Sequence, residues 1–403
     1  MGMIIRKAIP NQEQRFKEDG TLFSWEDYIN NCVCIIFARH SKASTIICVN
    51  DPYGNTASIK NEERQRSSNG ENISNTHMKL SDKFPSNTEL NKILKNDYNK
   101  SRLQVFLKDC LKKRMRDENV RLLYSLENCI DLGNDTDIAE LYCNQAEADT
   151  IMLTIYHYVR TLLNDNKPVA IDSEDADIYV QLAYVAHKMP GLNIYKGKEK
   201  RFVDCRSLCS REMAEVIIQL HVMTGCDSNS AFFGVGKMKM FNKLQMTEEA
   251  RNMIKLCGQS ERITDSTIEI LCTFIIKYVY NDSKSKNLTE ARVAKWKYFK
   301  KKKSLARLPP DNDSLSQHIT RANYLAYIQL NNSLRSHPSP IGNGWILQNG
   351  SCYAQRHTKD KLPKYVIIED ANSHNSDDES DDDSPSEVAS FSNNDTSSTD
   401  EKK

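Results

Sequence analysis

Four short motifs between Gln145 and Lys237 carry the residues best suited to chemistry. Three supply five carboxylates and the fourth is a glycine turn followed by a lysine: Glu147-Ala-Asp149, Asp175-Ala-Asp177, Thr224-Gly-Cys-Asp227 and Gly234-Val-Gly236-Lys237. Carboxylates that meet at one place repel one another, so they persist only if a cation neutralises them or if some are protonated. The acids therefore raise the question of which cation they share.

A set of carboxylates offers hard oxygen ligands, which Mg²⁺ and Mn²⁺ prefer. Two such ions about 3.5–4 Å apart can activate a water molecule and stabilise the leaving oxygen in phosphodiester hydrolysis. That reaction needs several carboxylates and no covalent nucleophile. The acids predict a site for two Mg²⁺ or Mn²⁺ ions that hydrolyses DNA or RNA.

The elements around the acids decide whether they can meet. Pro168–Ile171 is a short apolar run typical of a buried parallel strand, so Asp175 and Asp177 follow its carboxyl end. Thr150–Val159 is apolar nearly all round and predicts a buried helix. Acids at the start of a helix are favoured by its dipole in any case, which is the simpler interpretation of either acidic pair taken alone.

Asp227 follows a further helical pattern in which apolar residues recur at helical spacing. The members of that pattern are Met213, Val216, Ile217, Leu220 and Met223. His221 lies on the same apolar face, and we interpret it as a hydrogen-bonded core histidine rather than a general base. The segment Lys295–Lys303 interleaves aromatic and basic residues, which suits either nucleic-acid contact or a solvated helix end.

The ordered set of motifs resembles the acidic motifs and helix-hairpin of PIN-like nucleases of the flap endonuclease type. His221–Lys237 more narrowly resembles a group of animal proteins associated with mobile elements that carry such a domain. The resemblance spans about Phe23 to Trp345 and includes Ser58–Arg64, Leu308–Pro310 and His318–Tyr324. It implies an α/β, PIN-like (Rossmann-like) fold with a central, mostly parallel sheet flanked by helices.

The resemblance also assigns roles to residues of this chain. It places Asp51, after the β-branched run Thr45–Val49, among the metal ligands, although an isolated Asp-Pro is ordinarily a turn. The implied catalytic and metal-binding set is Asp51, Glu147, Asp149, Asp175, Asp177 and Asp227. The implied nucleic-acid contacts are Lys60, Arg64, Arg66, Gly234, Gly236 and Lys237.

The first twenty residues depart from the resembled pattern. That fold begins with a strand ending in a catalytic Asp, whereas Met1–Gly20 contains no convincing strand and offers only Asp19. This departure favours a second hypothesis, in which the chain is a catalytically inactive nucleic-acid-binding or interaction protein derived from a mobile element. A third, a transposase with an RNase H-like carboxylate set, is disfavoured by the Gly-x-Gly turn behind the last acid.

The composition predicts a globular middle with polar ends. We expect a poorly ordered N-terminus (1–22) and a nuclease domain (23–245), with a mobile, arch-like insertion (55–100) inside that domain. A helical extension (246–346) and a linker with a disordered acidic tail (347–403) should follow.

Charge and cysteine content narrow the class of protein. From Glu369 onwards there are twelve acids and two lysines, so the preceding 368 residues carry a net charge of +11, as a phosphate-binding protein requires. The 12 cysteines are scattered, some within apolar runs, which indicates reduced thiols. We therefore expect a DNA or RNA partner, no membrane partner, and an intracellular, nuclear rather than cytoplasmic location.

Overall fold

The computed structural model divides into two compact units, Met1–Thr358 and Lys359–Lys403, and the second lies outside the described residues, as does Asp19. The predicted acidic tail therefore falls mostly on residues that are not described. The described residues are 8–10, 21–53, 58–60, 62–63, 66, 74–115, 119–126, 128–145, 147–162, 167–189, 191–196, 201–299 and 307–358.

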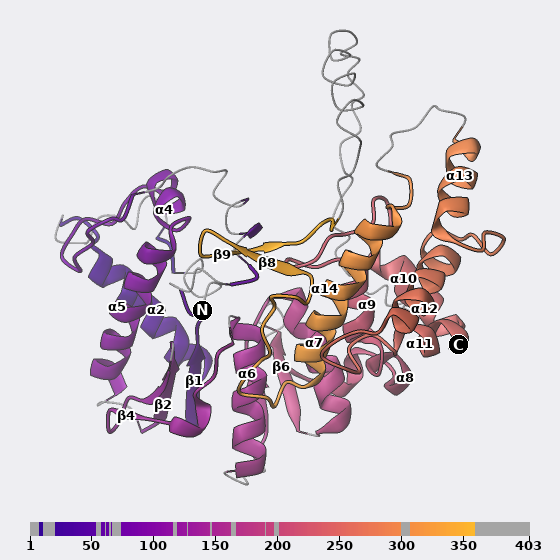
Figure 1. Ribbon diagram of the computed structural model, residues 1–403. Coiled ribbons are helices and arrows are strands. Elements are labelled where there is room, and N and C mark those ends of the chain that lie inside the picture. The colour runs from indigo at the N-terminus through magenta and orange to yellow at the C-terminus, as the bar shows by residue number, and fades with distance from the viewer. Residues whose placement is uncertain are drawn as a thin grey trace, which may run out of the picture. The chain divides into compact units, whose positions relative to one another are not determined.

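The first unit is an α/β structure (Figure 1). Its helices are α2 (Trp25–Arg39), α4 (Asn87–Ile93), α5 (Asp97–Met115), α6 (Ala148–His157), α7 (Ala176–Lys188), α8 (Arg211–Ala214), α9 (Ile217–Thr224), α10 (Lys237–Met246), α11 (Glu248–Ile254), α12 (Asp265–Phe274), α13 (Leu288–Tyr298) and α14 (Asn312–Leu330). Its strands are β1 (Thr45–Val49), β2 (Arg121–Ser125), β3 (Cys129–Asp131), β4 (Thr136–Asp137), β5 (Val169–Ile171), β6 (Leu192–Lys196), β7 (Arg201–Asp204), β8 (Trp345–Gln348) and β9 (Ser351–Ala354).

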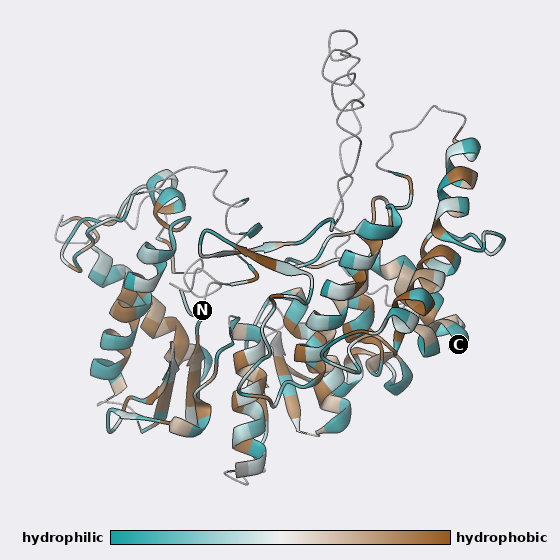
Figure 2. Ribbon diagram, in the orientation of Figure 1, coloured by the Kyte–Doolittle hydropathy of each residue, from teal (hydrophilic) through white to brown (hydrophobic). Residues whose placement is uncertain are grey.

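One sheet has the order β1-β2-β3-β4, with β1 and β2 parallel and the other pairs antiparallel. Side chains of β1 alternate between its two faces, as strand geometry requires. Ile46 and Cys48 are buried in the core that includes residues of α2 and α5, whereas Ile47 and Val49 pack against residues of α6. Helices therefore cover both faces of the β1–β2 pair, and Figure 2 shows these strands as hydrophobic.

A second sheet has the order β5-β6-β7. β5 and β6 are parallel and connected through α7, and β7 returns antiparallel to β6. The predicted single, mostly parallel sheet is therefore wrong, because the described strands form these two mixed sheets and a separate antiparallel pair, β8 and β9. Among the described residues no strand pairs with β1 opposite β2 or with β5 opposite β6, and Ala170 in the middle of β5 is exposed.

Asp172, the first residue after β5, connects this sheet to the end of α2. Its carboxylate lies 2.8 Å from Arg39 Nη2 and 3.2 Å from His40 Nε2. The acid nearest the strand end therefore serves an ion pair, and the predicted site acids Asp175 and Asp177 follow at the start of α7.

The chain beyond Met246 is helical as predicted, as far as α14, but it does not form a separate core. Leu271 and Phe274 of α12 and Ile319 of α14 share one core with residues of α7 and α9. After α13 the segment Lys300–Lys303 lies outside the described residues, while Trp296 and Tyr298 within the helix are exposed. No helix in the described residues combines the length and apolarity needed to cross a membrane.

The predicted linker from residue 347 contains a β-hairpin instead. β8 and β9 are antiparallel, and Asn349 and Gly350 between them have φ values of 49° and 75°. An Asn-Gly pair with positive φ is the strongest short signal for such a turn, and the sequence interpretation missed it. Trp345 at the start of β8 is 1% exposed and its ring contacts Tyr324 edge-on at 5.3 Å.

The second half of the predicted arch-like insertion is packed against the first sheet. Met78, Phe84 and Leu90 are buried in the core that holds α2 and α5. α4 begins with a capping box between Ser86 and Glu89. A few apolar anchors in a polar segment are therefore enough to fix residues 74–100.

Candidate metal and nucleic-acid site

Asp51 reaches the start of α6 from the end of β1. Its Oδ1 accepts a hydrogen bond from the backbone N–H of Ala148 at 2.9 Å, and its own carbonyl accepts one from Gln104 Nε2 at 3.1 Å. An anion at a helix N-terminus is favoured by the unpaired amides there. The fold thus brings together two acidic motifs that are about a hundred residues apart in the sequence.

Glu147 and Asp149 lie at the start of α6, as predicted. Glu147 is the N-cap residue but its side chain makes no capping hydrogen bond, and Asp149 is in the first turn. The side chain of Glu147 is therefore not used to cap the helix. The helix behind them is buried through Ile151, Leu153 and Ile155, which fixes its direction.

The ammonium group of Lys60 lies between two of the acidic motifs. Its Nζ is 3.6 Å from Glu147 Oε2 and 3.8 Å from Asp227 Oδ2. The lysine side chain is 19% exposed, as is that of Glu147, whereas that of Asp227 is 52% exposed. The predicted phosphate contact Lys60 therefore faces carboxylates in this structure.

The two acids of the second motif, Asp175 and Asp177, have different partners. Asp175 is exposed and caps α7, where its Oδ1 accepts from the N–H of Asp177 at 3.0 Å. Asp177 Oδ2 lies 3.4 Å from His221 Nε2, within ion-pair range but without the geometry of a hydrogen bond. His221 Nδ1 is 2.9 Å from Lys237 Nζ. A chain of three polar side chains thus connects the start of α7 with the start of α10.

His221 is 4% exposed, which agrees with the core position predicted for it. Its two ring nitrogens nevertheless face a site carboxylate and a site lysine, so it positions both. Sequence reasoning left it out because its helical face is apolar. Lys237 lies sixteen residues after His221, and no helix or strand repeat predicts a contact at that spacing. The contact forms because the turn between the two residues folds back.

The loop that carries Asp227 is held by its own backbone. Gly225 has φ 109°, and a Cβ there would meet Ala231 Cα at 2.6 Å. Asn229 exchanges backbone hydrogen bonds with Cys226, and its Nδ2 donates to the carbonyls of Val222 and His318. Only glycine therefore fits at position 225. The buried side chain of Asn229 fixes the loop to α9 and α14.

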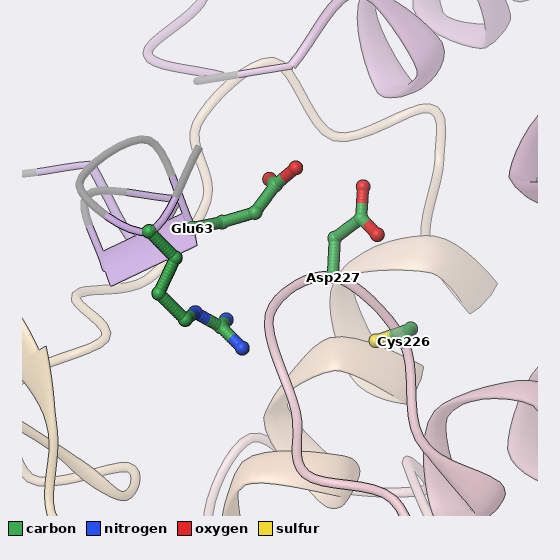
Figure 3. A pocket seen from close by; sticks show the side chains of 4 residues that line it. Glu63, Cys226 and Asp227 are labelled. Atoms are coloured by element: carbon green, nitrogen blue, oxygen red, sulfur yellow. The ribbon is translucent and has the colours of Figure 1, made fainter. Parts of the chain in front are cut away.

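A hollow of about 390 Å³ opens beside this loop, lined by Glu63, Arg66, Cys226 and Asp227. Figure 3 shows the carboxylates of Glu63 and Asp227 extending into it from different sides. Arg66 is among the predicted nucleic-acid contacts, and Arg64 lies outside the described residues. The hollow thus places Arg66 and Asp227 around one open space.

The glycine turn of the fourth motif is open to its surroundings. Gly234 has φ 72° and Gly236 caps α10. Apart from the chain neighbours, no atom of the described residues lies within 4 Å of a Cβ added at either position. The turn is therefore accessible to a ligand backbone, whereas the ammonium of Lys237 is directed to His221.

The electrostatics show that the carboxylates influence one another. Burial raises the pKa of Glu147, and the carboxylates of Asp51, Asp177 and Asp227 raise it further, against the opposing effect of Lys60. Burial and the carboxylates of Asp175 and Glu147 raise the pKa of Asp149 to about 7.

For Lys60 and Asp177, in contrast, the surroundings favour the charged form of the side chain. The carboxylates of Glu147, Asp51 and Asp149 raise the pKa of Lys60 against the effect of burial. Contact with His221 lowers the pKa of Asp177, again against the effect of burial. All six predicted acids therefore belong to one electrostatic cluster, whose negative charge exceeds what one ammonium group neutralises.

This donor set fits a divalent cation in chemistry. It supplies carboxylate oxygens, and the pKa values of Glu147 and Asp149 are raised first by burial and then by neighbouring carboxylates. As the side chains stand, no group of three His, Cys, Asp or Glu residues in the described part of the chain could hold a metal ion. In the described part of the chain, the cation that faces Glu147 and Asp227 is the ammonium group of Lys60.

No family model, no curated protein and no solved structure matches this chain. The function must therefore be argued from the geometry of the cluster itself.

Proposed function

We propose that the chain is a divalent-metal-dependent nuclease that hydrolyses phosphodiester bonds of DNA or RNA, with a fold of the PIN-like, flap endonuclease type. The observation that carries the proposal is that Glu147 and Asp227 face one ammonium group, that of Lys60, while Asp51 accepts from the amide of Ala148 beside Glu147. These residues come from three segments that are distant in the sequence, and they lie at the ends of helices and strands. A purely structural ion pair would need only one carboxylate beside the ammonium group.

Mg²⁺ or Mn²⁺ would be held by Asp51, Glu147, Asp149, Asp175, Asp177 and Asp227. When bound, the ions would supply an activated water molecule and charge stabilisation for the leaving oxygen. The chain's own residues orient this set: Asp51 is fixed on the amide of Ala148, and His221 holds Asp177. Arg66, in the hollow beside Asp227, would bind a substrate phosphate.

The test is a cleavage assay with the full chain. The purified protein is incubated with Mg²⁺ or Mn²⁺ and 5′-flap, hairpin and single-stranded DNA and RNA. We expect cleavage that chelation abolishes and that the double substitution Asp175→Asn with Asp177→Asn reduces by at least about a hundredfold. Cleavage that survives the double substitution would indicate a contaminating nuclease.

A second candidate function is nucleic-acid binding without catalysis. It is favoured by the position of Lys60, which supplies a counter-charge inside the acidic cluster without any metal. Stable binding of the same substrates with no cleavage in any metal would support this alternative against the nuclease.

A further inference from the structure

Lys60 differs from a surface lysine in how its segment is fixed. Ser58, two residues earlier, is 3% exposed, and its Oγ accepts a hydrogen bond from the N–H of Lys60 at 3.3 Å. Two residues later, Glu62 accepts hydrogen bonds from the N–H of Ala354 at 2.8 Å and from Arg356 Nη2 at 3.1 Å. The segment is therefore attached on both sides of Lys60, and its side chain is directed at the acids.

The ammonium group occupies the place where opposite charge is most needed. It lies within 4 Å of oxygens from two acidic motifs, and Asp51 and Asp149 also stabilise its charged form. One monovalent ammonium cannot balance several carboxylates, since it brings a single positive charge to the oxygens of Glu147 and Asp227. A divalent ion at the same oxygens would bring twice the charge and stronger coordination.

A divalent ion and the ammonium group cannot both occupy these oxygens. Glu147 Oε2 and Asp227 Oδ2 would have to turn from one cation to the other, and two cations at van der Waals distance repel. The hollow beside Asp227, lined also by Glu63 and Arg66, offers room into which the lysine side chain can withdraw.

We propose that Lys60 is an internal counter-cation whose ammonium group holds the carboxylates of Glu147 and Asp227 until a divalent ion displaces it. This inference rests on the proposed function for the metal site. Lys60 then sets the affinity for the ion: metal binding must break two ion pairs, and the displaced ammonium becomes available to a phosphate in the neighbouring hollow.

The test compares Mn²⁺ binding by the full-length wild type and Lys60→Met, which keeps the length of the side chain and removes its charge. Isothermal titration should show at least about tenfold tighter Mn²⁺ binding in the variant. In EDTA the variant should unfold at a lower temperature than the wild type, and Mn²⁺ should restore it. Lys42→Met, at an exposed lysine before β1, is the matched control and should behave as the wild type.

A second measurement needs no variant. Acylation of the wild type, read by mass spectrometry, should label Lys60 several-fold faster with Mg²⁺ than with EDTA, while Lys42 remains unchanged. Equal labelling in the two conditions, or equal Mn²⁺ affinity of Lys60→Met and the wild type, would overturn the role of Lys60 and leave the nuclease proposal standing. Absence of Mn²⁺ binding in both proteins would overturn both.

Discussion

At the scale of single residues, Glu147 and Asp149 show how the surroundings decide the chemistry of an acid. Acids at a helix start are usually solvated and stabilise the helix dipole. Here burial and neighbouring carboxylates work against ionisation, and the pKa of Asp149 rises to about 7. The sequence correctly placed both acids at the start of α6, but only the packed structure shows that they repel other acids.

Asp149 gives a pH-dependent prediction. Its pKa is higher in the folded chain than its ordinary value of 3.8, so its contribution to stability is complete below pH 4 and is lost as the pH rises through about 7. Without metal, Asp149→Asn should therefore be more stable than the wild type at pH 8, by about 1–2 kcal/mol after discounting for solvent screening. The advantage should shrink as the pH falls toward 4.

Thermal unfolding in EDTA at several pH values measures this effect. Asp265→Asn, at an exposed acid in the first turn of α12, is the control and should show no such pH-dependent gain. An advantage of Asp149→Asn that is constant from pH 4.5 to pH 8 would contradict the electrostatic explanation.

Gly225 gives a second prediction at this scale. Its φ of 109° and the 2.6 Å distance from an added Cβ to Ala231 Cα leave no room for a side chain. Gly225→Ala should reduce the free energy of unfolding by about 2–4 kcal/mol. Gly236→Ala, where no atom lies within 4 Å, should cost less than about 1 kcal/mol. Equal losses in denaturant unfolding would refute the steric argument.

At the scale of elements, the sequence predicted the strands and helices that carry the acids better than the way the strands combine. The β-branched run of β1, the apolar run of β5 and the helical patterns of α6 and α9 follow local chemistry. Strand pairing depends on distant partners, so the antiparallel returns β2–β3 and β6–β7 were not visible in the pattern. The Asn349-Gly350 turn was visible and was missed.

The hairpin matters to the site because β9 anchors the Lys60 segment. Glu62→Ala removes the acceptor of the Ala354 N–H and the partner of Arg356. Hydrogen exchange at the Ala354 amide should become roughly tenfold faster, the equivalent of about 1.4 kcal/mol. Glu248→Ala, in the first turn of α11, should leave this amide unchanged. An unaltered exchange rate in Glu62→Ala would show that the anchor lies elsewhere.

At the scale of the whole molecule, the first unit includes the hairpin and ends at Thr358, twelve residues beyond the boundary predicted from the sequence. The composition from residue 347 onwards is polar, which predicted a linker. Two short strands with one buried side chain each hardly change that composition. Trp345 and Cys352 belong to the same core as α9 and α14. The predicted helical extension therefore shares one core with α7 and α9 of the preceding region.

Two shortened chains test this boundary. A chain ending at Thr358 should keep the melting temperature of the full chain to within about 2 °C, because it retains the whole first unit. A chain ending at Pro340 loses Trp345, which is 1% exposed, and should lose about 3–5 kcal/mol of stability. Equal melting temperatures of the two shortened chains would contradict a shared core.

The most direct test of the metal site is anomalous X-ray diffraction from crystals of the protein grown with Mn²⁺. We predict one or two Mn²⁺ peaks within about 2.5 Å of carboxylate oxygens of Glu147, Asp149 or Asp227, with the ammonium of Lys60 moved out of the cluster. Crystals in Mn²⁺ that show no peak there, with Lys60 still between Glu147 and Asp227, would contradict it.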